Sequence, residues 1–445
     1  MTGANYLLDF ETIKILVDCG LNQGSKYAED LNYEPFGYDP KIIDYVLVTH
    51  SHIDHVGRLP KLYKEGFRGT VMTSEATKDL MAVALPDNMS HIAREANDAG
   101  REPLFDQHDL NGLMSLTRGV NYDIAHDLGN GISVTFHDAG HILGSSIIEI
   151  LWPSKGQIKR IFFTGDLGNP PTPLLRPTEF VHDANYIVIE SAYGDRVHEA
   201  REERKQKLAD VIIDTINRKG VLMIPSFALE RTQEMLFELN ELHNKKTIPD
   251  VPIFIDSPLA IKMTDVYKKH VKDFNKAANY LIDSGDDVFR FPGLRMTPSV
   301  DESKAINDVP LPKIIIAGSG MSQGGRILHH EIRYLSDPNS TILFVGYQVD
   351  GSLGRRIQKG DKVVTIYRQK VEVKAHIETI SSYSAHADQP ALLHWIQIAN
   401  TGKRLEKVFV VQGEETSAKT LANLVHERFA VEAVAPQTGD NFELD

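Results

Sequence analysis

The stretch VLVTHSHIDHVGRLP, residues 46–60, places three histidines and one aspartate within six consecutive positions. The β-branched run IIDYVLVT precedes them, so we expect a strand to end where these polar side chains begin. A turn at that point can aim alternate side chains into one cavity. Imidazole and carboxylate groups together suit zinc, manganese or iron, and crowding them has little structural use. The stretch therefore predicts a metal site. Its candidate ligands are His50, His52, Asp54 and His55.

Two later strand ends offer further ligands. His141 lies in HDAGHILGSS and Asp166 in FFTGDLG, each an apolar run followed by glycine and a polar group. Taken alone, each is a turn residue of an ordinary kind. A site for two ions needs more ligands than the first cluster supplies, so His141 and Asp166 become candidates to complete it.

Composition limits the class of protein. The chain has 445 residues, 42% hydrophobic and 24% charged, and no apolar run long enough to cross a membrane. Its start lacks the pattern of a signal peptide. The single cysteine, Cys19, excludes an internal disulfide framework and favours the cytoplasm. A net charge of −13 argues against holding nucleic acid by bulk electrostatics, although a local basic groove or bound metal can reverse the field in a cleft.

The pattern of elements changes along the chain. Short β-rich runs come first, with helical stretches such as 74–98 between them. After residue 195 an amphipathic helix over 201–220 leads into four strand–loop–helix units, which predict a parallel α/β sheet with ligands at the carboxyl ends of its strands. Short strands and two helices return near residue 369. We therefore expect one domain formed by 1–191 and 369–445, with a second domain, 192–368, inserted into it.

These motifs carry a family resemblance. The D-x-G that begins at Asp18, the H-x-H-x-D-H cluster, His141 and Asp166 occur in an order that resembles the metallo-β-lactamase superfamily. The insertion, Glu190 in IESAYGD, His386 in YSAHAD and the glycine-rich GSGMSQGGR resemble its β-CASP branch, whose members process RNA or DNA. The resemblance covers nearly the whole chain. It implies an αββα sandwich with an inserted Rossmann-like α/β domain.

The resemblance also implies a site for two divalent ions, expected to be zinc. It assigns His50, His52 and His141 to one ion. Asp54 and His55 would hold the second ion, Asp166 would bridge the two, and Asp18 would orient a histidine through its ring N–H.

Two departures from the family pattern matter. RNA-cleaving members carry a histidine ligand of the second metal where this chain has Gln412, in VFVVQGEE. An amide oxygen is a weaker zinc ligand than imidazole, so the second ion is expected to bind loosely, to be manganese, or to be missing. The chain also starts one strand later than its relatives, which suggests a truncated or variant start with an exposed sheet edge. Similar proteins often dimerise, and such an edge favours a homodimer.

The chemistry implied is phosphodiester hydrolysis by a metal-bound hydroxide, which leaves a 5′-phosphate. In this scheme His386 is the general acid and Glu190 holds its ring in the useful tautomer. Ser319 and Gly320 would cradle a phosphate at a helix N-terminus. Arg231 and Arg326 are further candidates for backbone contacts, although either could equally be a solvated helix arginine.

We predict a zinc-dependent ribonuclease acting on single-stranded RNA, either within the chain or from its 5′ end. Three alternatives stay open. A small-molecule hydrolase would use the same metals, but needs no insertion of this size. A DNA-directed nuclease of the same branch fits the missing histidine at Gln412. A metal-binding scaffold for RNA processing fits an impaired second site, although the other motifs are intact.

Overall fold

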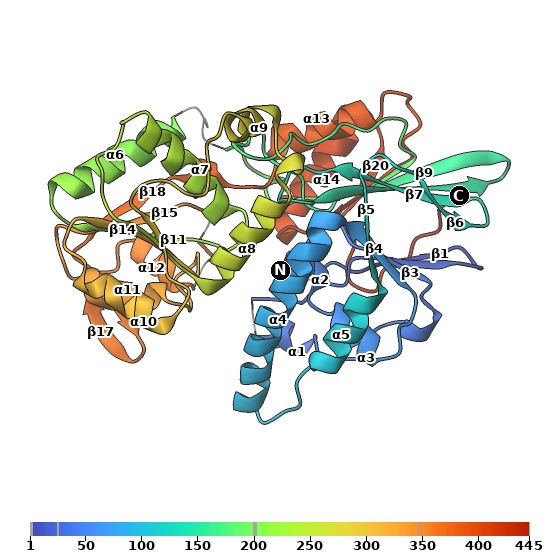
Figure 1. The fold of residues 1–445 in the computed structure, drawn as a ribbon. Helices are drawn as coiled ribbons and strands as arrows, with labels where there is room; N and C mark the ends of the chain where they lie inside the picture. Colours follow the sequence, from blue (N-terminus) through green and yellow to red (C-terminus); the bar gives the residue numbers. More distant parts are fainter. Residues whose placement is uncertain (1–2, 25, 199–202, 347, 350, 445) are drawn as a thin grey trace. The chain divides into compact units, whose positions relative to one another are not determined.

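The computed structural model describes residues 3–24, 26–198, 203–346, 348–349 and 351–444. The chain divides into two compact units (Figure 1). Unit 1 comprises 1–172, 176–197 and 386–445, and unit 2 comprises 173–175 and 198–385.

Unit 1 contains two sheets among its described residues. The first has five strands in chain order, and all neighbours are parallel except the antiparallel pair β1–β2. These strands are β1 (Tyr6–Asp9), β2 (Lys14–Val17), β3 (Tyr45–Leu47), β4 (Thr70–Ser74) and β5 (Thr117–Val120). The helices of this region are α1 (Lys26–Asp30), α2 (Ile53–Val56), α3 (Leu59–Lys64), α4 (Glu75–Asp98) and α5 (Gln107–Leu116).

The second sheet has seven strands among the described residues, in the order β20-β19-β10-β9-β8-β7-β6. Its strands are β6 (His126–Gly129), β7 (Ile132–Asp138), β8 (Ser146–Ser154), β9 (Gln157–Phe163), β10 (Tyr186–Glu190), β19 (Lys407–Val411) and β20 (Glu432–Val434). Two helices from the end of the chain, α13 (Gln389–Ala399) and α14 (Glu415–Phe429), accompany it.

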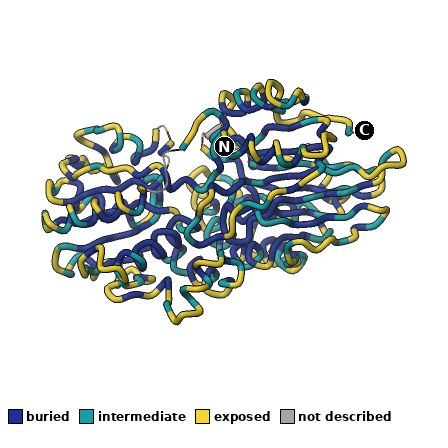
Figure 2. The backbone as a smooth tube through the Cα atoms, turned by 90° about the horizontal axis from the view of Figure 1, so that it is seen from above, coloured by how far each residue is buried: buried dark blue, intermediate teal, exposed yellow. Residues whose placement is uncertain are grey.

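Alternating apolar residues explain why these layers stack. In β2, Ile15 and Val17 enter a core shared with the second sheet, whereas Leu16 packs with helix residues such as Met81 and Leu113. Strand β10 shows the same alternation, because successive side chains along a strand point to opposite faces of the sheet. Its Val188 joins the core between the sheets, while Ile187 and Ile189 join Trp395 and Leu421 of α13 and α14. The result is the predicted αββα sandwich, with its strands largely buried in Figure 2.

Unit 2 is built on a parallel sheet, also as predicted. Its order among the described residues is β13-β12-β14-β11-β15-β18. The strands are β11 (Val221–Pro225), β12 (Ile253–Asp256), β13 (Leu294–Met296), β14 (Lys313–Ala317), β15 (Thr341–Phe344) and β18 (His376–Thr379). The helices are α6 (Arg204–Asn217), α7 (Arg231–Asn244), α8 (Pro258–Lys269), α9 (Lys276–Asp283), α10 (Val300–Ala305), α11 (Ile327–Tyr334) and α12 (Leu353–Gln358). A separate hairpin pairs β16 (Val363–Ile366) with β17 (Gln369–Glu372).

The second boundary of the inserted unit differs from the one expected near residue 369. Residues 369–385 belong to unit 2, because β17 pairs with β16 and β18 adds to the sheet beside β15. The chain returns to unit 1 only at His386. The helix expected over 201–220 is α6, and residues 201–202 lie outside the described part. Among the described residues, none of the helices has the length and apolar character needed to span a membrane.

Candidate metal centre

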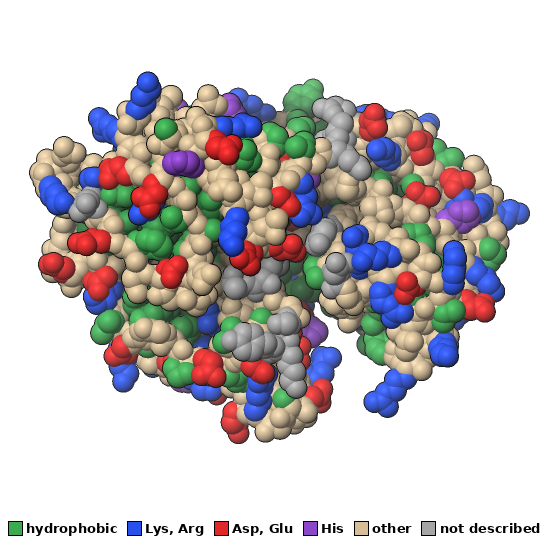
Figure 3. All heavy atoms as spheres, turned by 180° about the vertical axis from the view of Figure 1, so that it is seen from behind, with side chains coloured by type: hydrophobic (Ala, Val, Ile, Leu, Met, Phe, Trp, Pro, Cys, Tyr) green, Lys and Arg blue, Asp and Glu red, His purple; other side chains and the backbone are tan. Residues whose placement is uncertain are grey.

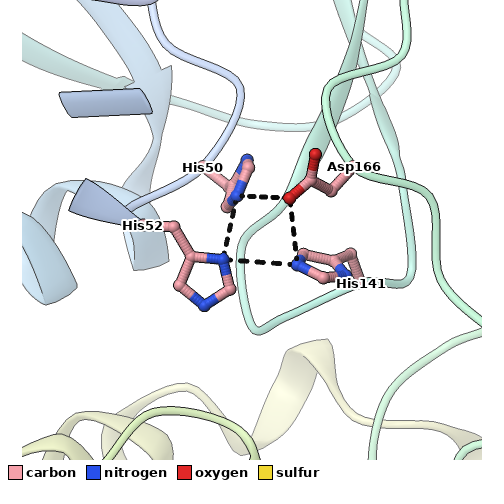
Figure 4. A group of neighbouring side chains, drawn as sticks. All are labelled: His50, His52, His141 and Asp166. Atoms are coloured by element: carbon pink, nitrogen blue, oxygen red, sulfur yellow. Dashed lines mark hydrogen bonds and ion pairs between the residues drawn. The ribbon is translucent and has the colours of Figure 1, made fainter. Parts of the chain in front are cut away.

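Four side chains from three strand ends of unit 1 point toward one another (Figure 4). His50 and His52 follow β3, His141 follows β7, and Asp166 follows β9. One ligand atom from each lies within 4.8 Å of the others. All but the half-buried His52 are buried.

The spacing of these atoms suits a tetrahedral ion. The His52 Nδ1 atom lies 3.1 Å from His50 Nε2 and 3.3 Å from His141 Nε2. The Asp166 Oδ2 atom lies 3.3 Å from His50 Nε2 and 3.5 Å from His141 Nε2. Zinc bonds of about 2.0–2.1 Å in a tetrahedron place neighbouring ligand atoms about 3.3 Å apart. These four separations match that value, and every pair in the group lies within 4.8 Å, so the group can hold one zinc ion.

The electrostatics favour the same interpretation. Burial lowers the pKa of His50, His52 and His141, so their rings are neutral and present lone pairs. Burial alone would raise the pKa of Asp166, but the surrounding histidines lower it well below the usual value. Neutral imidazoles around an ionised carboxylate are the protonation states that a metal ion requires.

A second set of candidate ligands lies near the other carboxylate oxygen of Asp166. The His55 Nε2 atom is 3.5 Å from Asp166 Oδ1 and 3.2 Å from Gln412 Nε2. Turning the Gln412 amide would bring its carbonyl oxygen to the same place. Asp54 is half-buried in the first turn of α2, and its charge raises the pKa of His386. His55 and Gln412 thus lie beside Asp166, but among the described residues neither Asp54 nor His55 belongs to a group of three His, Asp or Glu side chains whose ligand atoms gather within 4.8 Å.

Asp18 is buried beneath this group and orients His55. Its Oδ2 atom lies 2.7 Å from His55 Nδ1, which leaves Nε2 facing Asp166. Burial alone would lower the pKa of His55, but the Asp166 and Asp18 carboxylates raise it well above the usual value. Asp18 also accepts hydrogen bonds from the backbone N–H of Thr49 and from its hydroxyl group, both at 2.8 Å.

Sequence analysis missed Thr49. Its hydroxyl oxygen lies 3.0 Å from His50 Nδ1 and 3.3 Å from His55 Nδ1, so it contacts the rear nitrogens of two candidate ligands. Groups that bind the second nitrogen of a ligand histidine fix its tautomer and ring orientation. A threonine at the end of a β-branched strand looks like an ordinary strand residue, so no sequence signal marked it.

Two glycines permit this close arrangement of loops. A Cβ atom on Gly20, in the D-x-G motif, would lie 1.5 Å from the carbonyl oxygen of Asp54. Gly165, directly before Asp166, has a φ angle of 52°, and a Cβ atom there would lie 2.7 Å from that of Thr49. Both positions therefore require glycine for the loops to approach.

His386 and Glu190 form a pair beside the metal ligands. The His386 Nδ1 atom lies 3.0 Å from Glu190 Oε2, and its ring centroid lies 4.6 Å from that of His141. Burial alone would lower the pKa of His386, but Glu190 and Asp166 raise it to about 9. Glu190 is fully buried and also accepts a 2.6 Å hydrogen bond from Leu167 N–H. The pair therefore holds a protonated, half-buried imidazolium next to the ligands.

The glycine-rich loop lies in unit 2, between β14 and α11. Its Ser319 hydroxyl oxygen accepts a hydrogen bond from Gln323 N–H at 3.1 Å, so the hydroxyl proton can be donated to a ligand. Gly320 is covered by the Phe227 ring, which a Cβ atom would approach to 2.7 Å. Phe227 follows β11 and is itself 44% exposed. An exposed aromatic ring thus lies against the loop.

Neither arginine occupies the open position expected of a phosphate contact. Arg231 is buried, and its guanidinium group binds Glu234 at 2.7 Å. Arg326 donates to the Asp256 carboxylate at 2.8 Å and to the carbonyl oxygens of Thr297 and Pro298. Both charges are used inside unit 2, because buried or half-buried carboxylates compete for them more strongly than solvent does. Spacing in sequence does not reveal such partners.

An αββα sandwich with a histidine-rich metal centre at its strand ends, interrupted by a parallel α/β unit, defines the metallo-β-lactamase fold with an insertion. Family models agree: "Metallo-beta-lactamase superfamily" matches residues 2–140 and "Beta-Casp domain" residues 232–357. "Zn-dependent metallo-hydrolase RNA specificity domain" matches residues 370–436. The chain belongs to the metallo-β-lactamase superfamily, in its β-CASP branch.

Similar proteins cover nearly the whole chain. Ribonuclease TTHA0252 from Thermus thermophilus is 37% identical over 96% of this chain and 93% of its own length. Transcription termination factor FttA from Methanosarcina mazei is 31% identical over 97% of this chain and 68% of its own length. A crystal structure of an Enterococcus faecalis protein of unknown function shares the fold, with a TM-score of 0.54, 14% identity and coverage of 99% of this chain and 96% of the other.

Proposed function

We propose that the protein is a metal-dependent ribonuclease that hydrolyses phosphodiester bonds of single-stranded RNA and leaves a 5′-phosphate. The observation that carries the proposal is the buried three-histidine, one-aspartate centre with the His386–Glu190 pair beside it. A 37% identical relative that bears the name ribonuclease supports RNA as the substrate.

We propose two zinc ions as the metals. The first would be held by His50, His52, His141 and Asp166, and the second by Asp54, His55, Asp166 and, weakly, Gln412. Manganese is the alternative at the second position, because Gln412 offers an amide oxygen in place of imidazole. When bound, the ions activate water for attack at phosphorus and offset the charge that develops on the phosphoryl oxygens.

The residues of the chain supply the remaining groups. His386 is proposed as the general acid that protonates the leaving oxygen, because Glu190 keeps its ring charged and fixed through Nδ1. The other ring nitrogen, Nε2, then carries the proton to be donated. Asp18 and Thr49 keep the ligand histidines in the required tautomers.

RNA contacts are proposed on unit 2. Ser319 and Gly320 would bind a backbone phosphate at the start of the segment leading to α11, and Phe227 would stack on a base. Binding by broad positive charge is a poor fit to the net charge of −13 and to the surface in Figure 3, where basic and acidic side chains are interspersed. Local contacts and the metal ions would therefore provide the affinity.

A DNA-directed nuclease is the second candidate, and the observation that favours it is Gln412 in place of the histidine of RNA-cleaving members. The test is side-by-side incubation of the zinc-loaded protein with single-stranded RNA, single-stranded DNA of the same sequence, and a chromogenic ester. Cleavage of RNA alone supports the proposal. Cleavage of DNA but not RNA would replace the proposal with a DNA-directed nuclease. Turnover of the ester alone would replace it with a small-molecule hydrolase.

Two further proposals concern assembly and location. A homodimer is proposed from the position of β1 at the edge of its sheet, where Leu7 is 37% exposed. Light scattering of the purified protein would test it. A cytoplasmic location is proposed from the single cysteine, Cys19, which is buried and reduced.

A further inference from the structure

A second cluster of metal-ligating groups lies in unit 1, outside the centre described above. Asp123, His137 and Glu179 each offer one ligand atom, and these atoms lie within 4.8 Å of one another. The His137 Nδ1 atom is 3.0 Å from Asp123 Oδ1 and 3.3 Å from Glu179 Oε1. We propose that this outer cluster, Asp123, His137 and Glu179, is a structural binding site for a divalent transition-metal ion such as zinc.

The orientation of His137 is the first argument. Its other ring nitrogen, Nε2, lies 3.1 Å from Glu149 Oε2, and Arg160 holds the Glu149 carboxylate at 2.9 Å. A histidine that binds a metal through one nitrogen almost always donates the other N–H to a carboxylate, carbonyl or water. Glu149 therefore accepts from Nε2–H, and Nδ1 faces the two remaining carboxylates, where an ion could take the place of its proton.

The backbone is the second argument, because it fixes all three ligands relative to one strand. His137 belongs to β7 itself. The backbone N–H of Asp123 donates to the carbonyl oxygen of Phe136 at 2.9 Å, and that of Glu179 donates to Asp138 at 2.9 Å. The ligands are thus brought together before any ion binds, which removes much of the ordering cost of binding.

Charge balance is the third argument. The carboxylates of Asp123, Glu149 and Glu179 carry three negative charges. With His137 protonated, His137 and Arg160 carry two positive charges, so one negative charge is left over. With His137 neutral and a divalent ion at Nδ1, the charges cancel. Binding of the ion would release the Nδ1 proton to solvent.

The location suggests what the ion would do. Glu179 lies next to Thr178, whose hydroxyl group donates to the carbonyl oxygen of Ala139 at 2.9 Å. Ala139 leads directly into the loop that carries His141. An ion in the outer cluster would therefore fasten the segment around residue 178 to β7 and stabilise the loop that presents His141 to the first metal centre.

The test compares the zinc content of a variant, a matched control and the unchanged protein, each as the full 445-residue chain dialysed to equilibrium against buffered zinc. The variant is Asp123→Asn/Glu179→Gln, which keeps the shape of both side chains and changes residues that are partly exposed. The matched control is Asp210→Asn/Glu427→Gln, which changes two exposed residues on α6 and α14. Thermal unfolding with and without zinc provides a second measurement.

We expect the Asp123→Asn/Glu179→Gln variant to bind one zinc equivalent fewer than the control and the unchanged protein, and to gain less thermal stability from zinc. The comparison does not depend on nuclease activity, because the catalytic ligands are the same in all three proteins. Equal zinc content in all three would overturn the proposal and leave the outer cluster as an ion pair centred on protonated His137.

Discussion

Replacing Gln412 by histidine should strengthen the second metal position. The Gln412 amide already lies 3.2 Å from His55 Nε2, the separation expected of two ligands of one ion. The residue has a φ angle of 50°, a conformation in which histidine is several-fold enriched among non-glycine residues. The substitution should therefore be tolerated.

The size of the effect can be bounded from ligand chemistry. Removing a group that merely orients a metal ligand changes affinity by about 10–100-fold. Exchanging a neutral amide for imidazole changes the ligand itself, so the second ion should bind at least about tenfold more tightly, or by about 1.4 kcal/mol. The substitution leaves all four ligands of the first ion in place, so its affinity should stay the same.

Isothermal titration with zinc of the metal-free protein separates the two binding events. Gln412→Asn serves as the matched control, because it keeps an amide but withdraws it from His55. Gln412→His should show two tight sites, and Gln412→Asn a second site no better than that of the unchanged protein. Equal second-site affinity in all three proteins would refute the assignment of Gln412 to the second ion.

Three further predictions follow from other sites. Burial raises the pKa of Glu331 to about 8. Stability should therefore fall as pH rises from about 5 to 8, because the carboxyl ionises in the unfolded chain but stays protonated in the folded one. Glu331→Gln should raise Tm at pH 8 and leave it nearly unchanged at pH 5, and an equal shift at both would contradict the burial argument. Phe227→Ala should raise KM for RNA about 5- to 160-fold, from a stacking loss of about 1–3 kcal/mol. Phe227→Trp should restore the KM, and Tyr280→Ala, which changes an exposed ring, should leave it unchanged. Glu190→Gln removes the charge that raises the pKa of His386, so the alkaline limb of the pH–rate profile should move to lower pH; an unmoved limb would argue against His386 as the acid.

Much of the fold could be predicted because it depends on local patterns. The β-branched run before His50 ends in β3, and the strand–helix alternation after residue 195 becomes the parallel sheet of unit 2. The end of the insertion could not be located in this way. Strand β18 belongs to unit 2 through pairing with β15, and such long-range pairing leaves no mark in the short strand itself.

The residues of the candidate site could likewise be predicted where they depend on local patterns and not where they depend on long-range contacts. His50, His52, His141 and Asp166 could be picked out because each polar residue follows a strand, and strand ends meet at one edge of the sandwich. The sequence could not reveal the role of Thr49 or the partners of Arg231 and Arg326, because these depend on contacts that the sequence does not show. The outer cluster was missed for the same reason, since residues 123, 137 and 179 become neighbours only through their backbone bonds to β7.

Cleavage of a 5′-labelled single-stranded RNA tests the central claim most directly. The assay compares the unchanged protein, Asp166→Ala, the exposed control Asp210→Ala, and the unchanged protein with a chelator. Asp166 contacts both groups of ligands, so its loss should abolish both metal binding and cleavage, as should the chelator, while Asp210→Ala stays active. The product ladder would also distinguish internal cutting from trimming at the 5′ end. Cleavage that survives both Asp166→Ala and the chelator would contradict a metal-dependent nuclease centred on Asp166.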